Sequence, residues 1–235
     1  MESKHNSHTL TNRLEENSVR RRFVGHDFFR RVAEAPLAVD KAAVIVGQWW
    51  HPLHYFPTFL ARCIAVLPDI ESKSAISRIL AQEAGGGNVG RAHEVVYIHT
   101  MERAGFSRRQ ITGQAPFRET AALVEGYRRG SRDRCSALGS IFATEVTDLL
   151  MVSAIGKAVA GATGVTDLEW VEIHVEQEPD HVEEANHTMM HDFSAAEEGL
   201  VLESAEEMWR LWEGFFNRLG KEISASSHGR HKIPA

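Results

Sequence analysis

Residues 172–181 read Glu172-Ile-His174-Val-Glu-Gln-Glu178-Pro-Asp-His181 and hold the most informative spacing in the chain. In a helix, residues at offsets of four and seven lie along one face, so His174, Glu178 and His181 form a single stripe. Imidazole and carboxylate together suit iron, manganese or zinc. The same spacing is also common on solvated helix faces, so a metal site needs further ligands from elsewhere in the chain.

A second carboxylate, Glu145, stands in the middle of a strongly apolar helix that the sequence predicts from Ser131 onward. An unpaired charge in such a helix costs several kcal/mol or forces the carboxyl group to bind a proton. Glu145 therefore needs a cation nearby. That cation is either a metal ion or the basic partner in a buried ion pair. Alternatively, Glu145 faces a groove and needs no such partner.

Glu83 and His93 flank the glycine-rich stretch AGGGN. Glycine costs about 1 kcal/mol relative to alanine in a helix interior, so a helix predicted over residues 73–82 should loosen here and resume near Val89. A loosened segment lets both side chains reach the same site as the histidine stripe. The glycines alone also fit an ordinary loop, and His99 competes with His93 as the ligand.

The remainder of the chain also has helical periodicity, and no strand or internal repeat is evident. Further helices are predicted over residues 9–33 with a break near Gly25, over 40–67 with Asp40 as N-cap and bends at Pro52 and Pro57, from Val89 to Ala104, in a turn from Ser107, over 117–129, from Asp167, and over 194–223. We expect an all-α bundle of about seven helices. It should form a single domain over residues 1–235, with residues 1–8 and 225–235 as disordered tails.

Composition narrows the classes of function. The chain has 235 residues, 43% of them hydrophobic, and a net charge of -6. It can therefore bury one substantial core, and it lacks the basic balance of a nucleic-acid binder. Only Cys63 and Cys135 occur, the N-terminus is polar, and the longest apolar run recognised, around residues 42–46, is too short to cross a membrane. We expect a cytoplasmic protein with a small-molecule partner, no nucleic acid and no membrane.

The combined pattern resembles the haem-oxygenase-like di-metal oxidases, which are related in fold to thiaminase-type and pyrroloquinoline-quinone-synthase proteins. The resemblance rests on the segments QEAGGGNVGRAH, ATE and EIHVEQEPDHVEE and covers the core from Val44 to His187. It implies a haem-oxygenase-like fold that binds two ferrous ions per chain and reacts with O2. The implied metal ligands are Glu83, His93, Glu145, His174, Glu178 and His181.

The sequence departs from this family pattern at two places. Pro179 directly follows Glu178 and removes a helical hydrogen bond, which predicts a kink in the ligand stripe. Family members that oxygenate nitrogen can bring an extra carboxylate from the first core helix, whereas residues 43–62 contain none and offer His51 and His54 instead.

The implied activity is N-oxygenation of a small amine or amino-acid-like metabolite in a biosynthetic pathway. Oxidative C–C cleavage, decarboxylation or desaturation by the same iron pair stays open, and an external electron donor and a homodimer are further expectations. Aromatic side chains predicted near the stripe are candidate substrate contacts, although such residues also pack in cores. These are Trp49, Trp50, Tyr55, Phe56 and Trp170. Tyr127 and Arg128 could contact a substrate carboxylate, but we expect them on a solvated helix face.

Two other classes of function compete with the oxygenase. A metal-free, thiaminase-like hydrolase would use Cys135 as its nucleophile, but no histidine base is evident near Cys135 in the sequence and six ligand-type residues would go unused. A helical binding or ferritin-like storage protein would take up iron without substrate turnover.

Overall fold

The computed structural model describes residues 9–190 and 192–224, and this part of the chain forms helices and no strands. The helices are α1 (Leu10–Glu15), α2 (Ser18–Val24), α3 (Asp27–Glu34), α4 (Val39–Val66), α5 (Ile70–Glu83), the 3-10 turn η1 (Val89–Arg91), α6 (His93–Arg103), α7 (Arg108–Thr112), α8 (Arg118–Gly130), α9 (Arg134–Thr163), α10 (Glu169–Thr188) and α11 (Ala195–Ser224). The all-α prediction is confirmed. The predicted tails, 1–8 and 225–235, lie outside the described residues.

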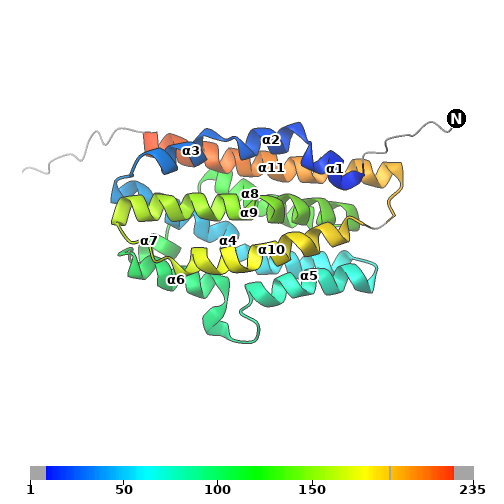
Figure 1. The fold of residues 1–235 in the computed structure, drawn as a ribbon, viewed down its shortest axis with the longest axis horizontal. Helices are drawn as coiled ribbons and strands as arrows, with labels where there is room; N and C mark the ends of the chain where they lie inside the picture. Colours follow the sequence, from blue (N-terminus) through cyan, green and yellow to red (C-terminus); the bar gives the residue numbers. More distant parts are fainter. Residues whose placement is uncertain (1–8, 191, 225–235) are drawn as a thin grey trace, which may run out of the picture.

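The N-terminal segment forms three short helices where the sequence predicts one helix broken near Gly25. Gly25 does end α2, but Thr9, Asn17 and His26 each accept a hydrogen bond from a backbone N–H in the first turn that follows. Each of these caps starts a new helix, which raises the number of helices above the predicted seven or so. The three short helices lie along α11 (Figure 1).

Several predicted helix starts are wrong by up to three residues: α5 begins at Ile70 and not at residue 73, and α10 begins at Glu169 and not at Asp167. Helix α4 begins at Val39, so Asp40 lies in the first turn and is not the N-cap. Its negative charge there interacts favourably with the positive end of the helix dipole. Helix α9 is capped by Asp133 and not by Ser131, because the Asp133 carboxylate accepts the backbone N–H of Ser136 at 3.0 Å. Neighbouring polar residues compete for the same capping role.

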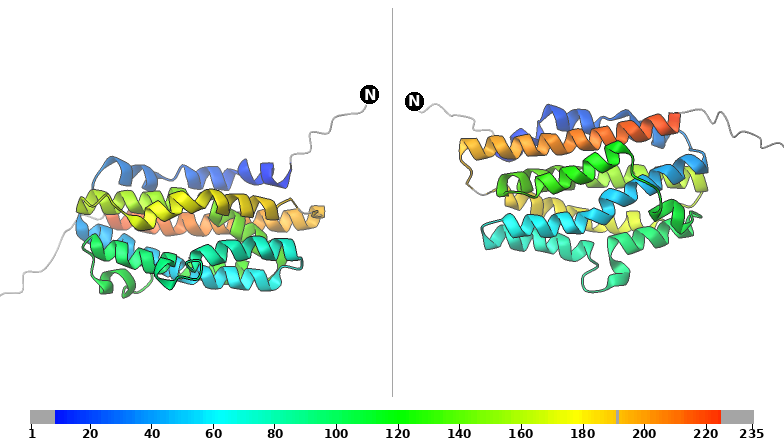
Figure 2. Two further views of the ribbon diagram at one scale, coloured as in Figure 1. Left: turned by 60° about the horizontal axis from the view of Figure 1, so that its bottom comes forward. Right: turned by 180° about the vertical axis from the view of Figure 1, so that it is seen from behind.

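Helix α9 is the central helix of the bundle and packs against α3, α4, α8, α10 and α11 (Figures 1 and 2). Its apolar stretch is longer than the sequence analysis recognised, and its length and composition would also suit a membrane span. However, 72% of its most apolar window is buried inside the protein. The other helices therefore cover the apolar surface of α9, and Glu145 lies in the middle of this core.

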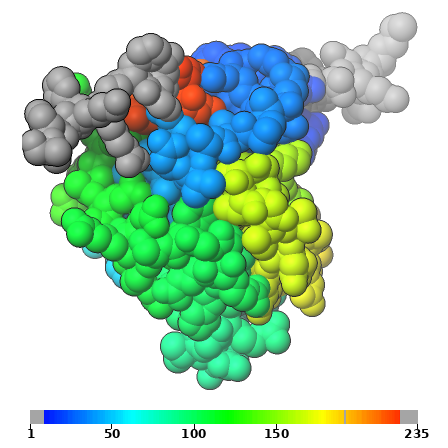
Figure 3. Space-filling model, turned by 90° about the vertical axis from the view of Figure 1, so that its left-hand side faces the viewer, coloured from blue at the N-terminus to red at the C-terminus, as the bar shows by residue number. Residues whose placement is uncertain are grey.

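Helices α5, α6, α9 and α10 surround the predicted ligand positions. Helix α10 packs against α5, α6 and α9, so its inward face meets all three. The connection between α5 and α6 projects from the body of the molecule (Figures 1 and 3). Its two ends carry Glu83 and His93 back to the interior.

Candidate metal centre

All six predicted ligands lie in one buried region, and none is more than 5% exposed. Their ligand atoms form two groups, within each of which the atoms lie no more than 4.8 Å apart. The first triad is Glu83, His93 and His174, and the second triad is Glu145, Glu178 and His181. The imidazole rings of His93 and His181 lie 6.4 Å apart between centroids, so the two triads are neighbours.

The glycine-rich connection brings Glu83 and His93 together. Glu83 is the last residue of α5, which ends in a Schellman arrangement: the backbone N–H groups of Gly85 and Gly86 bond to carbonyls of the last turn at 2.8 and 2.7 Å. Gly85 has a φ of 84°, and a Cβ there would overlap the carbonyl of Asn88. The chain returns so that His93 opens α6, with its Nδ1 3.0 Å from Oε2 of Glu83.

The other stripe is carried by α10, which is one continuous helix through Pro179. Pro179 therefore does not separate the ligands on its two sides. Its missing N–H leaves the carbonyl of Val175 without its helical partner, and Val175 is 55% exposed, so water can bond to that carbonyl. His174, Glu178 and His181 remain on the buried face.

Hydrogen bonds orient the two imidazoles of the first triad. Nδ1–H of His174 donates to the carbonyl of Trp170 at 2.7 Å, which leaves Nε2 free to bind a metal. Nε2–H of His93 donates to Oε1 of Gln177 at 3.0 Å, which leaves Nδ1 free. Such outer partners fix the tautomer and the ring orientation of metal-binding histidines. Nε2 of His181 has no hydrogen-bond partner among the described residues.

The donor atoms fit a pair of metal ions. Oε1 of Glu145, both carboxylate oxygens of Glu178 and Nε2 of His181 are buried and lack hydrogen-bond partners within the described part of the chain. Buried polar atoms are nearly always partnered in native proteins, so these atoms require a missing partner. Their oxygen and nitrogen chemistry suits iron or manganese, and carboxylates can balance the charge of two ions.

Without metal, the site lowers its negative charge by holding protons on carboxylates. Burial, together with the negative charges of Asp148 and Glu145, raises the pKa of Glu178 to about 12. Burial and the Glu145 carboxylate likewise raise the pKa of Asp148 to about 7. Binding of metal ions therefore has to displace protons from this cluster.

The pKa values of His174, His181 and Glu83 shift in different directions. Burial and the nearby charge of His93 lower the pKa of His174 to about 3, so this ring is neutral and ready to bind a metal. Burial opposes the charge on His181, but the Glu145 carboxylate outweighs it and raises the pKa to about 9. Burial also opposes ionisation of Glu83, yet the charge of His93 lowers its pKa to about 2.

Asp148 is a site residue that the sequence analysis missed. It lies one helical turn after Glu145 on α9, and its Oδ2 is 3.8 Å from Nε2 of His174. Its side chain is 18% exposed and lines the adjoining cavity. The spacing Glu145-x-x-Asp148 within an apolar helix is the signal that could have identified it.

A narrow cavity adjoins the metal ligands, with about 20 Å³ accessible to water, enough for about one molecule. One side consists of Glu83, Glu145, Asp148 and His174, and the rest consists of Trp49, Pro52, Leu53, Phe56, Tyr127, Thr144 and Trp212. None of the described residues that line this cavity is a lysine or an arginine. It therefore combines an acidic floor with aromatic and aliphatic walls.

Only some of the five candidate substrate contacts line the cavity. Trp49 and Phe56 do so. Trp170 is buried and packs with its edge against the His174 ring, 4.9 Å between centroids, so it supports a ligand and does not line the cavity. Trp50 and Tyr55 are half-buried and do not line the cavity, because only one face of α4 is turned toward the metal ligands.

The prediction that Tyr127 lies on a solvated face is wrong, because its side chain is only 1% exposed. Its ring packs on Phe59 with centroids 4.6 Å apart, and it lines the cavity. Arg128 points outward and pairs with Glu125 at 2.7 Å. The recurrence of Leu123 and Tyr127 four residues apart is the helical signal for an inward face.

Cys135 lacks the surroundings of a catalytic nucleophile. It is buried near the start of α9, and it does not line the cavity beside the metal ligands. Burial and the carboxylate charges of Glu197 and Asp133 raise the pKa of its thiol. A raised pKa disfavours the thiolate, which is the reactive form.

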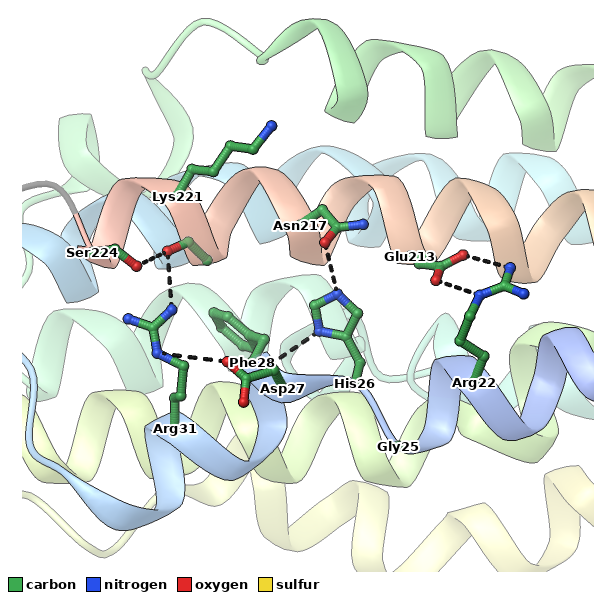
Figure 4. Close-up of a pocket in the computed structure, with 11 residues that line it drawn as sticks. Arg22, Gly25, His26, Asp27, Phe28, Arg31, Glu213, Asn217, Lys221 and Ser224 are labelled. Carbon is green, nitrogen blue, oxygen red and sulfur yellow. Dashed lines mark hydrogen bonds and ion pairs between the residues drawn. The ribbon is translucent and has the colours of Figure 1, made fainter.

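A more voluminous surface groove of about 680 Å³ lies between α2, α3 and α11, away from both triads (Figure 4). Its arginine, aspartate and glutamate side chains already have partners within the protein. Arg22 donates to both carboxylate oxygens of Glu213 at 2.6 and 2.8 Å, and His26 bonds to Asn217 at 3.2 Å. The groove holds none of the predicted metal ligands.

Solved structures share this architecture. One is a CADD-like protein of unknown function from Nostoc punctiforme, 14% identical, with a TM-score of 0.74 over 92% of this chain and 96% of that one. Another is a domain of unknown function with a heme oxygenase-like fold from Shewanella denitrificans, 16% identical, with a TM-score of 0.74 over 96% and 97%. A putative TenA-like thiaminase from Sulfolobus solfataricus is 13% identical, with a TM-score of 0.60 over 91% and 95%. The chain therefore has a haem-oxygenase-like fold.

The sequence was also compared with protein families and with curated proteins. The curated proteins gave no significant match. A family model described as iron-containing redox enzyme matches residues 44–213, which is most of the chain and includes both triads. This chain therefore belongs to the iron-containing redox enzyme family.

Proposed function

We propose that the protein is a non-haem di-iron oxygenase that uses O2 to oxidise a small amine or amino-acid-like metabolite, with N-oxygenation as the preferred reaction. The observation that carries this proposal is the pair of buried triads, in which several carboxylate and imidazole atoms lack hydrogen-bond partners among the described residues. The buried cysteines, Cys63 and Cys135, are both free, which fits the reducing cytoplasm where ferrous iron is available.

The residues of this chain have distinct tasks in such an enzyme. Two ferrous ions held by the triads would supply electrons to O2 without an organic cofactor. The hydrogen bonds from His93 and His174 to Gln177 and to the Trp170 carbonyl keep the metal-facing nitrogens in place. The small cavity leaves room for about one water, so side chains must move for a substrate to enter, and the substrate then displaces that water.

The lining of the cavity supports an amine as the substrate. Aromatic rings of Trp49, Tyr127 and Trp212 face a floor of carboxylates, and this combination attracts a cationic or protonated amine. The absence of lysine and arginine from the lining leaves a substrate carboxylate without a basic side chain to bind it. A compact amine with an apolar body therefore fits the lining best.

Oxidative C–C cleavage, decarboxylation or desaturation is a second candidate, and one observation favours it. The part of α4 that lines the cavity supplies Trp49, Pro52, Leu53 and Phe56, with no carboxylate among them. The extra carboxylate that nitrogen-oxygenating relatives can bring from this helix is therefore missing. An apolar wall at that position also suits a substrate that reacts at carbon.

Anaerobic loading with ferrous iron, followed by rapid mixing with oxygenated buffer, tests the proposal. We expect two irons per chain and a transient visible absorption whose rise or decay is accelerated by the correct compound in a panel of amines and amino acids. Analysis of the products by mass then separates N-oxygenation from C–C cleavage. Uptake of many irons per chain without substrate turnover would indicate storage, and no uptake would contradict the proposal.

A further inference from the structure

We propose that Asp148 is a seventh ligand of the metal centre, placed to bridge the two ions. This inference rests on the proposed di-iron function and extends it to a residue outside both triads. Helix α9 then provides two of the metal-binding carboxylates, Glu145 and Asp148, and these help to balance the charge of the two ions.

The position of Asp148 supports a bridge. Its Oδ2 lies 3.8 Å from Nε2 of His174, and this is the nitrogen that the hydrogen bond to the Trp170 carbonyl leaves free for metal. An ion bound by that nitrogen is within reach of the Asp148 carboxylate. Asp148 also lies one helical turn after Glu145 on α9, and both side chains line the same cavity as His174. Asp148 thus lies beside one member of each triad.

The charge of the centre also calls for a fourth carboxylate. The two triads contain three glutamates, Glu83, Glu145 and Glu178, with a combined charge of minus three against plus four for two ferrous ions. A buried uncompensated charge is costly in the low dielectric of the interior. None of the described residues that line the cavity is a lysine or arginine, and adding the Asp148 carboxylate brings the ligand charge to minus four.

Among the described residues, no lysine or arginine forms an ion pair with Asp148. The ion-pair contact that the structure records for Asp148 is with His174. Asp148 lies on the α9 side of the site, whereas α4 contributes only apolar side chains to the cavity.

Titration with Mn²⁺, followed by calorimetry and by electron paramagnetic resonance, tests this role without relying on turnover. Wild type, Asp148→Asn, Asp148→Glu and Asp180→Asn are compared. Asp180 is an exposed aspartate on α10 and serves as the matched control. We expect Asp148→Asn to bind the second Mn²⁺ at least about tenfold more weakly and to lose the spectrum of a coupled Mn pair. Asp148→Glu should partly restore both, and Asp180→Asn should match wild type.

The outcomes separate this inference from the function on which it rests. If wild type fails to bind two Mn²⁺ ions, the di-metal function itself is wrong. If wild type binds two and Asp148→Asn binds both with wild-type affinity and coupling, Asp148 is not a ligand. Weaker amine binding in that variant would then make it a substrate anchor. Melting of the metal-free variants controls for folding, and Asp148→Asn should be at least as stable as wild type because it removes a buried charge.

Discussion

The two triads differ in how much of each is held in place by the protein itself. In the first triad, Gln177 and the Trp170 carbonyl fix the outer nitrogens of His93 and His174. In the second triad, Oε1 of Glu145, both carboxylate oxygens of Glu178 and Nε2 of His181 lack partners in the described part of the chain. The protein therefore holds the side chains of the first triad in position without metal. The unpartnered atoms of the second triad, in contrast, need a metal ion as their partner. We expect the first triad to bind the tighter ion.

Removal of one histidine from each triad tests this difference and should have the largest effect. His174→Ala should abolish tight binding of the first ion and thereby prevent loading of the second. His181→Ala should retain the first ion and lose the second. Both variants should lose O2 reactivity, whereas His99→Ala, at an exposed position of α6, should keep it. Iron content per chain and the rate of O2 consumption measure the outcomes.

Equal iron content in His174→Ala and His181→Ala would contradict the proposed order of binding. Loss of O2 reactivity in His99→Ala would show that the wrong histidine of α6 had been assigned to the first triad. The Nδ1 contact of His93 with Glu83 at 3.0 Å argues for the assignment made here.

The pH dependence sharpens the same comparison. The pKa of His181 rises from 6.5 to about 9 on folding, and the pKa of Glu178 rises to about 12. A raised pKa stabilises the fold below the unfolded value, and this stability is lost as the pH rises through the folded value. The metal-free protein should therefore become less stable between pH 6.5 and 9. Affinity for the second ion should rise over this range, by about tenfold for each proton released per pH unit.

Melting temperature and Mn²⁺ affinity at several pH values measure these trends. The metal-loaded protein should show a flatter stability profile, because metal ions have replaced the protons. A metal-free melting temperature that rises steadily from pH 6.5 to 9 would show that the second triad does not hold the protons assigned to it.

Gln177→Ala tests the support of the first triad and should have an intermediate effect. Loss of the acceptor for Nε2–H of His93 should weaken the first ion by about 10- to 100-fold, as is typical for outer partners of metal-binding histidines. Glu176→Ala, an exposed neighbour on the same helix, is the control. If Gln177→Ala lowers the affinity for the second ion and not for the first, Gln177 does not support the first triad, and this prediction is wrong.

Gly85→Ala should have the smallest effect on metal binding, because it acts only through the connection between Glu83 and His93. The positive φ and the overlap with the Asn88 carbonyl should lower the free energy of unfolding by about 1–3 kcal/mol. Gly87→Ala has a similar φ of 87° but open space around its Cβ, so it should cost less. Urea unfolding of both variants measures the difference. An equal loss in the free energy of unfolding would show that the backbone shifts enough to remove the overlap at residue 85.

Much of the centre could be predicted because it depends on helical spacing. The stripe of His174, Glu178 and His181 follows from the period of one helix, and Glu145 is conspicuous among apolar neighbours. The pairing of Glu83 with His93 needed the glycine-rich break, together with the resemblance to a known family. These features are local in sequence, so they can be recognised without knowledge of packing.

The parts that were missed depend on how the helices rotate against one another. Trp49 and Trp50 are adjacent in sequence, and only the packing of α4 decides that Trp49 lines the cavity. The same holds for Tyr127, whose burial depends on the docking of α8. Asp148 was overlooked because a single buried carboxylate already explained the apolar helix, and its approach to His174 is a contact between α9 and α10.

Anomalous diffraction at the iron absorption edge, from crystals loaded anaerobically with ferrous iron, tests the central claim most directly. The account predicts two iron peaks, one bound by Glu83, His93 and His174 and the other by Glu145, Glu178 and His181. At limiting iron, the first peak should be the stronger. A single peak, or peaks bound by neither triad, would contradict a di-iron centre in this protein.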